Sequence, residues 1–453
     1  MTQFEIIGRF DTWPIEFGRD GNVLDDEQVK ALLIGVQSAT DLLVISHGWN
    51  NDENEASELY RELLGNLSSL PEVGAPRRLA VMRVYWPSKR FAEEDLIPGG
   101  AASALDAAEQ MLLNQIDALL VEYALRPPQP AEVFKPQALM AMKALLPRLE
   151  DDVDAQADFA RLVRLLMPGS VNEEEDVLLS EFTAAEGSDL LQKLSRPFRP
   201  PVQSDQGGAA GGVGQGAELA GQGGAASLGN LLRGPFNGAR NLLNLFTYYE
   251  MKERAGVVGR TGATDVLRRV VLARPGLRLH LCGHSFGGRL VAAALAFREA
   301  QPDAGGGVRS MVLLQAAFSH NGFGVRFDGQ HDGFFRRAFE GHRLNGPVVV
   351  THTKLDRAVG LAYPIASRLR SQVASGLGDA ADPYGAIGRN GALFASAEVD
   401  GSEAALRDVG QTYGPFLAGR IYNLEGAGFI SGHSAVRGRQ VAQALRHAMD
   451  AIR

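Results

Sequence analysis

The sequence has one cysteine, no long apolar run and no excess of basic residues, and each of these absences excludes a class of protein. Cys282 alone cannot build an intrachain disulfide framework, which fits a reducing compartment. No apolar run reaches the ~18–20 residues needed to span a bilayer. Residues 1–30 also lack the basic start and apolar core of a secretory signal. We therefore expect a cytoplasmic protein with no integral membrane association.

Basic residues are fewer than acidic ones, 45 against 53, and the net charge is −8. This balance argues against binding to nucleic acid or broadly to anionic lipid surfaces, although it leaves peripheral lipid contact open. No Cys/His cluster has the spacing of metal ligands, and no Rossmann or P-loop fingerprint is present. We therefore expect no metal and no cofactor, and the sequence leaves the oligomeric state open.

Short apolar runs alternate with helical patterns at both ends of the chain. The N-terminal residues 4–10 alternate in the manner of an edge strand, and further strands are expected at 42–45, 79–85, 277–282, 311–314, 348–352 and 421–424. Continuous apolar runs of this length are typical of strands buried on both faces. Strands that alternate with helices predict a doubly wound, mostly parallel sheet of the α/β class.

The alternation stops in the middle of the chain. Apolar residues at helical spacing predict helices near 103–125, 136–147, 155–167 and 174–185. A stretch at about 205–228, rich in Gly, Ala and Gln, has too few side chains to bury and predicts a flexible linker. The sequence thus divides into a core at 1–90 and 240–453 and a helical insertion at 91–239.

The strongest chemical signal is Gly283-His284-Ser285-Phe286-Gly287-Gly288, which lies between an expected strand and an expected helix. A nucleophile on such a sharp turn requires glycine two residues to either side, because larger side chains would collide with it. The start of the following helix also favours negative charge that develops beside Ser285. The alternative is a glycine-rich turn that serves only tight strand–helix packing.

This hexapeptide resembles the nucleophile elbow of lipases and esterases of the α/β-hydrolase family. The resemblance covers about 1–90 and 240–453. It implies an α/β-hydrolase fold with a mostly parallel central sheet, helices on both faces, and a large helical insertion that forms a lid or cap. It also implies a catalytic triad in the chain order Ser, acid, His.

Asp356 and His433 stand where the resemblance places the acid and the base. Asp356 follows the strand at 348–352, with Asp328, Asp332 and Asp382 as alternatives. His433 follows the last strand, as does His447, which lies inside the expected C-terminal helix. An imidazole has an ordinary pKa of ~6.5 and so suits proton removal from a serine near neutral pH. A solvated carboxylate paired with a neighbouring cation is the other interpretation of Asp356.

His47-Gly48-Trp49 resembles the oxyanion loop of the same family. The resemblance implies that the amide of Phe286 and that of Trp49 or Gly48 bind the oxyanion, although the sequence has H-G-W where the family has H-G-G-G. Side chains near the expected strand ends are candidates for substrate binding, namely His47, Trp86, His284 and Phe318.

The family resemblance implies a serine hydrolase that acts on carboxylic esters, with a small-molecule or lipid ester as substrate. An amidase, a peptidase or a thioesterase with the same triad would fit the same residues. So would a catalytically silent scaffold that binds a partner through the insertion, or a lipase that acts at membranes as an exported effector.

Overall fold

The computed structural model describes residues 4–71, 77–88, 104–125, 132–167, 187–195, 234–299, 307–356, 385–395 and 397–451. Its centre is an eight-stranded sheet in the order β1-β2-β4-β3-β5-β6-β7-β8. All neighbours are parallel except β1 and β2. The strands are β1 Glu5–Ile7, β2 Phe10–Glu16, β3 Asp41–Ser46, β4 Leu79–Tyr85, β5 Arg278–His284, β6 Ser310–Leu314, β7 Val348–His352 and β8 Ile421–Glu425. The chain therefore belongs to the α/β class.

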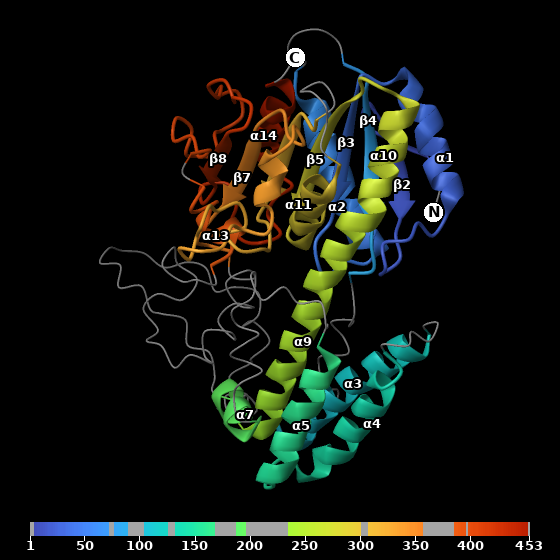
Figure 1. Cartoon of the computed structure of the whole chain (residues 1–453), viewed down its shortest axis with the longest axis vertical. Coiled ribbons are helices and arrows are strands. Elements are labelled where there is room, and N and C mark those ends of the chain that lie inside the picture. Colours follow the sequence, from blue (N-terminus) through green and yellow to red (C-terminus); the bar gives the residue numbers. More distant parts are fainter. Residues whose placement is uncertain are drawn as a thin grey trace, which may run out of the picture.

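Helices cover both faces of this sheet (Figure 1). Alternate residues of each strand point to opposite faces, so that Leu42 and Val44 of β3 belong to one apolar core while Leu43 and Ile45 belong to the other. The first core includes α1 Asp26–Gly35, α10 Thr264–Ala273 and α11 Phe286–Phe297. The second includes α2 Glu53–Ser69 and α14 Arg439–Asp450. Short helices are η1 Val36–Ser38, η7 Arg336–Phe339 and α13 Ile387–Asn390.

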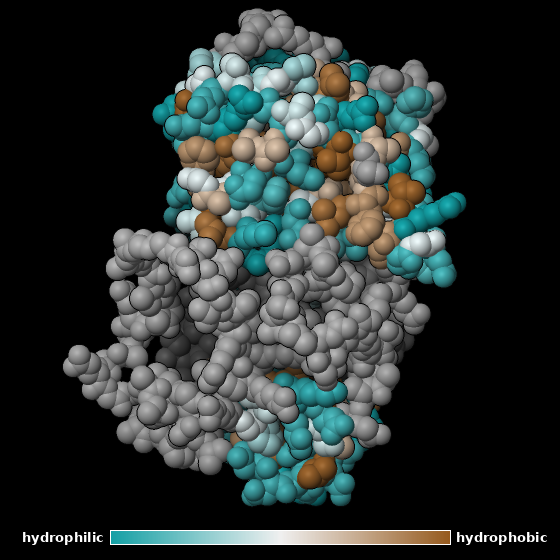
Figure 2. All heavy atoms as spheres, turned by 90° about the vertical axis from the view of Figure 1, so that its left-hand side faces the viewer, coloured by the Kyte–Doolittle hydropathy of each residue, from teal (hydrophilic) through white to brown (hydrophobic). Residues whose placement is uncertain are grey.

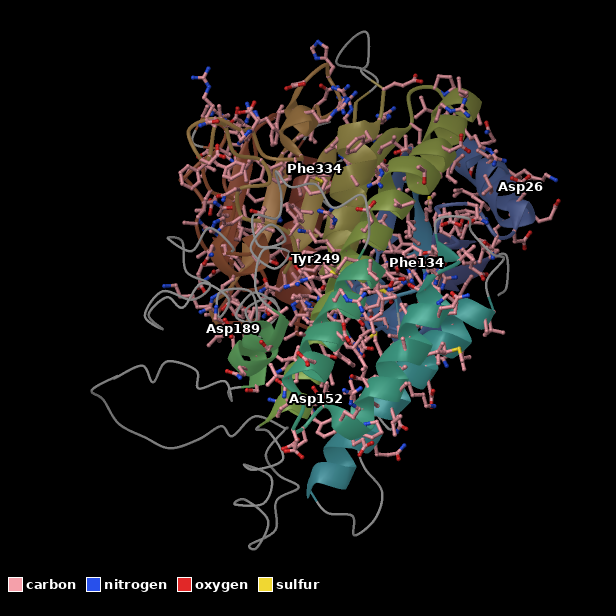
Figure 3. The ribbon with its side chains drawn as sticks, turned by 60° about the horizontal axis from the view of Figure 1, so that its bottom comes forward. Asp26, Phe134, Asp152, Asp189, Tyr249 and Phe334 are labelled. Carbon is pink, nitrogen blue, oxygen red and sulfur yellow. The ribbon has the colours of Figure 1, made fainter. Side chains whose placement is uncertain are left out.

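A separate group of helices lies beyond the end of the sheet to which the strands point (Figure 1). It comprises α3 Ala104–Ala124, α4 Lys135–Leu145, η4 Leu146–Arg148, α5 Val153–Leu166 and α7 Gly187–Ser195. In Figure 3 Asp152 marks the start of α5 and Asp189 lies on α7. The apolar stripe of α5, with Phe159 and Val163 fully buried, packs into this group.

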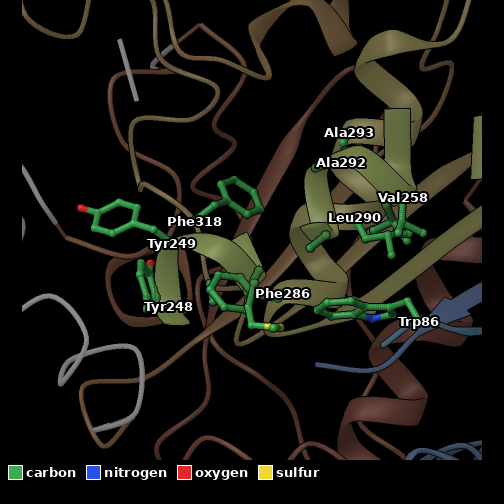
Figure 4. Close-up of a cluster of buried hydrophobic side chains, with 14 of the residues drawn as sticks. Trp86, Tyr248, Tyr249, Val258, Phe286, Leu290, Ala292, Ala293 and Phe318 are labelled. Carbon is green, nitrogen blue, oxygen red and sulfur yellow. The ribbon is translucent and has the colours of Figure 1, made fainter. Parts of the chain in front are cut away.

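One long helix, α9 Pro235–Val257, connects the helical group to the sheet (Figure 1). Its first turn begins at a proline, a residue well suited to that position. It continues through the π-helical turn η5 Val258–Ala263 into α10. At Gly259 any side chain would lie 2.2 Å from the backbone oxygen of Leu290, so glycine permits the close contact with α11. Figure 4 shows Tyr248, Tyr249 and Phe286 from α9 and α11 in the shared apolar core.

The described parts of 91–239 are helical, as expected, but α9 crosses residue 240 without interruption. The expected helix at 174–185 and the Gly-rich stretch at about 205–228 lie outside the described residues. The single edge strand expected over 4–10 is instead β1 followed by a turn at Gly8, with a φ of +62°, and Phe10 already begins β2. The sequence did not predict β2 because Pro14 cannot donate a ladder hydrogen bond.

Hydrophobic side chains lie scattered among hydrophilic ones on the face shown in Figure 2. Among the helices of the described ranges, none is both long enough and apolar enough to cross a membrane.

Candidate active site

Ser285 occupies the turn between the end of β5 and the start of α11, and its backbone is strained. Its φ of 55° and ψ of −125° lie in a region that non-glycine residues rarely adopt. A side chain at Gly283 would lie 2.3 Å from the Gly287 oxygen, and one at Gly287 would lie 2.3 Å from the Ser46 oxygen. Because these neighbours are backbone atoms that cannot turn aside, both positions require glycine.

Backbone hydrogen bonds hold this turn against the neighbouring strand. The Ser285 N–H donates to the Leu314 carbonyl at the end of β6, at 3.1 Å. The Ser285 carbonyl accepts from Gly288 at 2.9 Å and from Ala317 at 3.0 Å. The strained conformation is therefore fixed by its surroundings, which is the condition under which such strain persists.

Asp356 and His433 form a hydrogen-bonded pair. His433 Nδ1 lies 2.8 Å from Asp356 Oδ2. Asp356 is fully buried in the turn after β7, and its N–H donates to the Thr353 carbonyl at 3.1 Å. A carboxylate only accepts, so His433 Nδ1 carries a hydrogen, and in the neutral ring Nε2 then has the lone pair. A histidine in this tautomer can take a proton through Nε2.

Ser285 and His433 line one cavity of about 360 Å³. Its wall is apolar on Trp49, Leu59, Tyr248, Phe286 and Ala317, and polar on Asn50, Asn51, Glu55, His284, Ser285, His433, Ser434 and Arg437. The Tyr248 and Phe286 rings lie 5.2 Å apart, and the Trp49 and Phe286 rings 6.0 Å apart. Figure 4 shows Tyr248 beside Phe286. The cavity therefore combines an aromatic wall with hydrogen-bonding groups.

The loop after β3 lies directly against the serine. A side chain at Gly48 would come within 2.6 Å of Ser285 Cβ. The His47 N–H already donates to the Tyr60 hydroxyl at 2.8 Å, so it is not available to a ligand. The N–H groups of Gly48, Trp49 and Phe286 donate no hydrogen bond to any residue that the structure describes. These three remain the candidate oxyanion donors.

Residues after β4 hold this loop in place. The Asn50 N–H donates to the Ser88 carbonyl at 3.0 Å, and the Ser88 hydroxyl donates to the Asn51 carbonyl at 2.8 Å. The Trp86 indole N–H donates to the His47 carbonyl at 3.1 Å. The candidate oxyanion loop is thus fixed from its far side.

Three of the four side chains expected to bind substrate do not line the cavity. His47 and Trp86 are buried and stack on each other, with ring centroids 5.6 Å apart. Burial lowers the pKa of His47 to about 4, so its ring is neutral. Phe318 is fully buried against Phe335, at 4.9 Å between ring centroids. These residues were expected near the site because they lie close to strand ends, but in the structure their side chains are buried in the core. His284 does line the cavity.

The alternative acids and base lie elsewhere or outside the described residues. Asp328 pairs with His331 in an exposed loop, at 2.7 Å, and Asp332 accepts from the Arg326 N–H. Asp382 is outside the described residues. His447 bonds the Gln443 carbonyl within α14. In the described ranges, no group of three or more His, Cys, Asp or Glu side chains is arranged to hold a metal ion.

Gln315 and Tyr248 are site residues that the sequence did not reveal. Gln315 is fully buried after β6, and its Nε2 donates to Asp356 Oδ2 at 3.2 Å and to the Gly388 carbonyl at 2.9 Å. A polar residue directly after a buried strand was the available signal for Gln315. Tyr248 lies within a helix rich in apolar residues, and nothing in its spacing distinguishes it.

Comparisons with family models, with curated proteins and with solved structures find no match to this chain.

Proposed function

We propose that the chain is a serine hydrolase of the α/β-hydrolase fold that cleaves carboxylic esters. The observation that carries the proposal is the strained backbone of Ser285 between β5 and α11, above a cavity that His433 also lines. The Asp356–His433 hydrogen bond supports it, as does the chain order Ser, Asp, His.

In this mechanism His433 Nε2 takes the Ser285 hydroxyl proton while Ser285 Oγ attacks the acyl carbonyl carbon. Asp356 holds the His433 tautomer and stabilises the imidazolium that forms. The amide of Phe286 and that of Trp49 or Gly48 bind the tetrahedral oxyanion, and loss of one such donor typically costs ~10²–10³ in rate. The imidazolium then protonates the departing alcohol. A water molecule deprotonated by His433 releases the acid from Ser285.

The cavity supports a substrate with both an apolar and a polar part. Its aromatic wall suits an acyl or aryl group, and the Asn50, Asn51 and Arg437 side of the wall offers hydrogen-bond donors. A small-molecule or lipid ester meets these requirements. The helical insertion at 91–239 is proposed as the lid or cap, because Tyr248, on the helix that leads from it to the sheet, reaches the cavity. The single cysteine supports a cytoplasmic location.

Turnover of p-nitrophenyl esters of increasing acyl length, beside the matched p-nitroanilide and thioester, tests the proposal. We expect ester hydrolysis that is lost in Ser285→Ala and greatly reduced in His433→Ala and Asp356→Ala variants that remain folded. Preferential cleavage of the anilide or thioester would replace the esterase by an amidase, peptidase or thioesterase with the same triad. Absence of all three activities in the folded protein would favour a silent scaffold.

A further inference from the structure

His284 lies between the nucleophile and the loop that carries the base. It is the last residue of β5, directly before Ser285, and only 6% of it is exposed. Its Nε2 lies 2.9 Å from the backbone carbonyl oxygen of His433. Because a carbonyl oxygen only accepts, Nε2 carries the hydrogen and donates it. The two imidazole rings are 4.8 Å apart between centroids.

The loop around His433 has little other support for its main chain. It connects β8 to α14 without a helix or strand. Its first residue, Gly426, donates to the His352 carbonyl at 2.8 Å, but the backbone bonds nearer His433 are short-range, such as Ala435 to the Gly432 carbonyl at 3.1 Å. Asn66 reaches only the Arg437 carbonyl, at the far end of the loop. In the part of the chain that the structure describes, His284 supplies the one donor to the His433 carbonyl. The bond from Asp356 holds the His433 side chain but not its backbone.

The protonation state of His284 suits this contact. Burial is the main cause that lowers the pKa of His284 to about 3, and the nearby His433 is a smaller one, so the ring is neutral at ordinary pH. Its Nδ1 is buried and has no partner among the described residues. An unsatisfied buried acceptor costs about 1–3 kcal/mol. Stability alone therefore does not explain a histidine at position 284. The hydrogen bond from its Nε2 to the His433 carbonyl offers a reason for this residue.

We infer that His284 is a positioning residue, whose Nε2–H fixes the main chain of His433 relative to Ser285. This inference rests on the proposed function. Ser285 and His284 are adjacent in the chain, so one hydrogen bond ties the base to the turn that carries the nucleophile. Loss of that bond lets the imidazole drift from Ser285. A misplacement of about 1 Å can cost about 10²-fold in rate.

Kinetics of labelling by a fluorophosphonate test this role without a known substrate. Ser285 Oγ attacks phosphorus, fluoride leaves, and His433 takes the proton, so the maximal labelling rate reports the nucleophile–base pair and the probe's half-saturating concentration reports access. The His284→Gln variant keeps an N–H donor near the position of Nε2, and His284→Phe keeps a ring without the donor. We expect His284→Gln within about threefold of wild type. We expect His284→Phe to label about 10–100-fold more slowly at saturation, with a smaller change in the half-saturating concentration, since His284 also lines the cavity.

Thermal unfolding establishes that each variant is folded, and His284→Leu, which also lacks the donor, takes the place of His284→Phe where that variant does not fold. Equal labelling of the donor-less variant and wild type would overturn the inference. So would a His284→Gln variant as slow as His284→Phe, since ring packing would then matter more than the hydrogen bond. If the folded wild-type protein takes no label, or takes no more label than Ser285→Ala, the proposed function is wrong, and this inference is wrong with it.

Discussion

Gln315 shows how the candidate acid depends on a side chain that directly follows the neighbouring strand β6. The Gln315 side-chain NH2 donates to Asp356 Oδ2 and to the Gly388 carbonyl, and the residue has a left-handed φ of 44°. Its own N–H donates to the Thr351 hydroxyl on β7. The position of Asp356 is therefore set jointly by β6, β7 and the Gly388 segment.

The Gln315→Leu variant tests this dependence. It removes a donor to a buried carboxylate at similar volume, so we expect the free energy of unfolding to fall by about 1–3 kcal/mol. We expect kcat for an ester to fall about tenfold with little change in KM, because the acid orients the base and does not bind substrate. Gln315→Glu, which places a second carboxylate beside Asp356, is expected to be more harmful still. Urea denaturation and steady-state kinetics measure both, and unchanged kcat in a folded Gln315→Leu protein would contradict the assignment.

At the scale of elements, a buried polar cluster joins the beginnings of β3, β5 and β6. Asp41 accepts two hydrogen bonds from Arg278, each at 2.8 Å, and one from His280 Nε2 at 3.1 Å. His280 Nδ1 then accepts from the Ser310 hydroxyl at 2.8 Å. These are the residue types of a catalytic triad, but Ser310 is fully buried at the start of β6, at the opposite end of the strands from Ser285. The cluster therefore stabilises the sheet and is closed to substrate.

Asp41 gives the fold a pH dependence of known sign. Burial by itself raises the pKa of Asp41, but hydrogen bonds from His280, Arg278 and Thr40 outweigh it and hold the pKa well below its ordinary value. An unfolded aspartate titrates near pH ~3.9, so the stabilisation is complete above about pH 5 and is lost as pH falls below about 4.

We expect Asp41→Asn to lower the free energy of unfolding by about 3–5 kcal/mol at pH 7, since it removes the buried charge that pairs with Arg278 and puts an NH2 group against hydrogen-bond donors. The difference in free energy of unfolding between the Asp41→Asn variant and the wild type should decrease as the pH falls from about 6 to 3. The exposed pair of Arg268 and Asp265 offers a control, and Asp265→Asn should cost less than about 1 kcal/mol. Denaturant titrations at several pH values measure these free energies. A difference between variant and wild type that does not change with pH would contradict the role of the Asp41 carboxylate.

At the scale of the whole molecule, Arg254 joins the helical group to the sheet. Its side chain is buried and bonds Glu122 of α3 and Glu250 of α9, each at 3.0 Å. It also donates to the Pro87 carbonyl at 2.7 Å, next to Ser88, which holds the candidate oxyanion loop. The helical group is thus connected to the site through α9 and its Arg254 guanidinium, and Arg19, which follows β2, also pairs with Glu122.

The Arg254→Met variant keeps the apolar stem and removes the charge. We expect a loss of about 1–3 kcal/mol in the free energy of unfolding, because Glu122, Glu250 and the Pro87 carbonyl each lose a hydrogen bond from a buried cation. The matched control Arg268→Met, on an exposed pair of α10, should destabilise the protein much less, because water screens an exposed pair. Thermal and urea unfolding of the two variants compares them directly. Similar stability of both variants would contradict a role for Arg254 at the junction.

The parts of this architecture that depend on local pattern could be predicted from the sequence. Buried strands, the turn around Ser285 and the helical character of the described insertion all follow from periodicity or from glycine spacing. Contacts between distant segments could not. The role of Gln315 depends on the pairing of β6 with β7. The position of Tyr248 at the cavity depends on the path of α9. The burial of Trp86 and Phe318 depends on the conformation of the loops that carry them. The start of α9 at Gly234-Pro235 carried a local signal that the sequence analysis missed.

The most direct test of Ser285 as an activated nucleophile is fluorophosphonate labelling followed by mass spectrometry of the labelled peptide. We expect one label, on Ser285, that is absent in Ser285→Ala and strongly reduced in His433→Ala. A folded wild-type protein that takes no label, or a label that persists in Ser285→Ala, would contradict it.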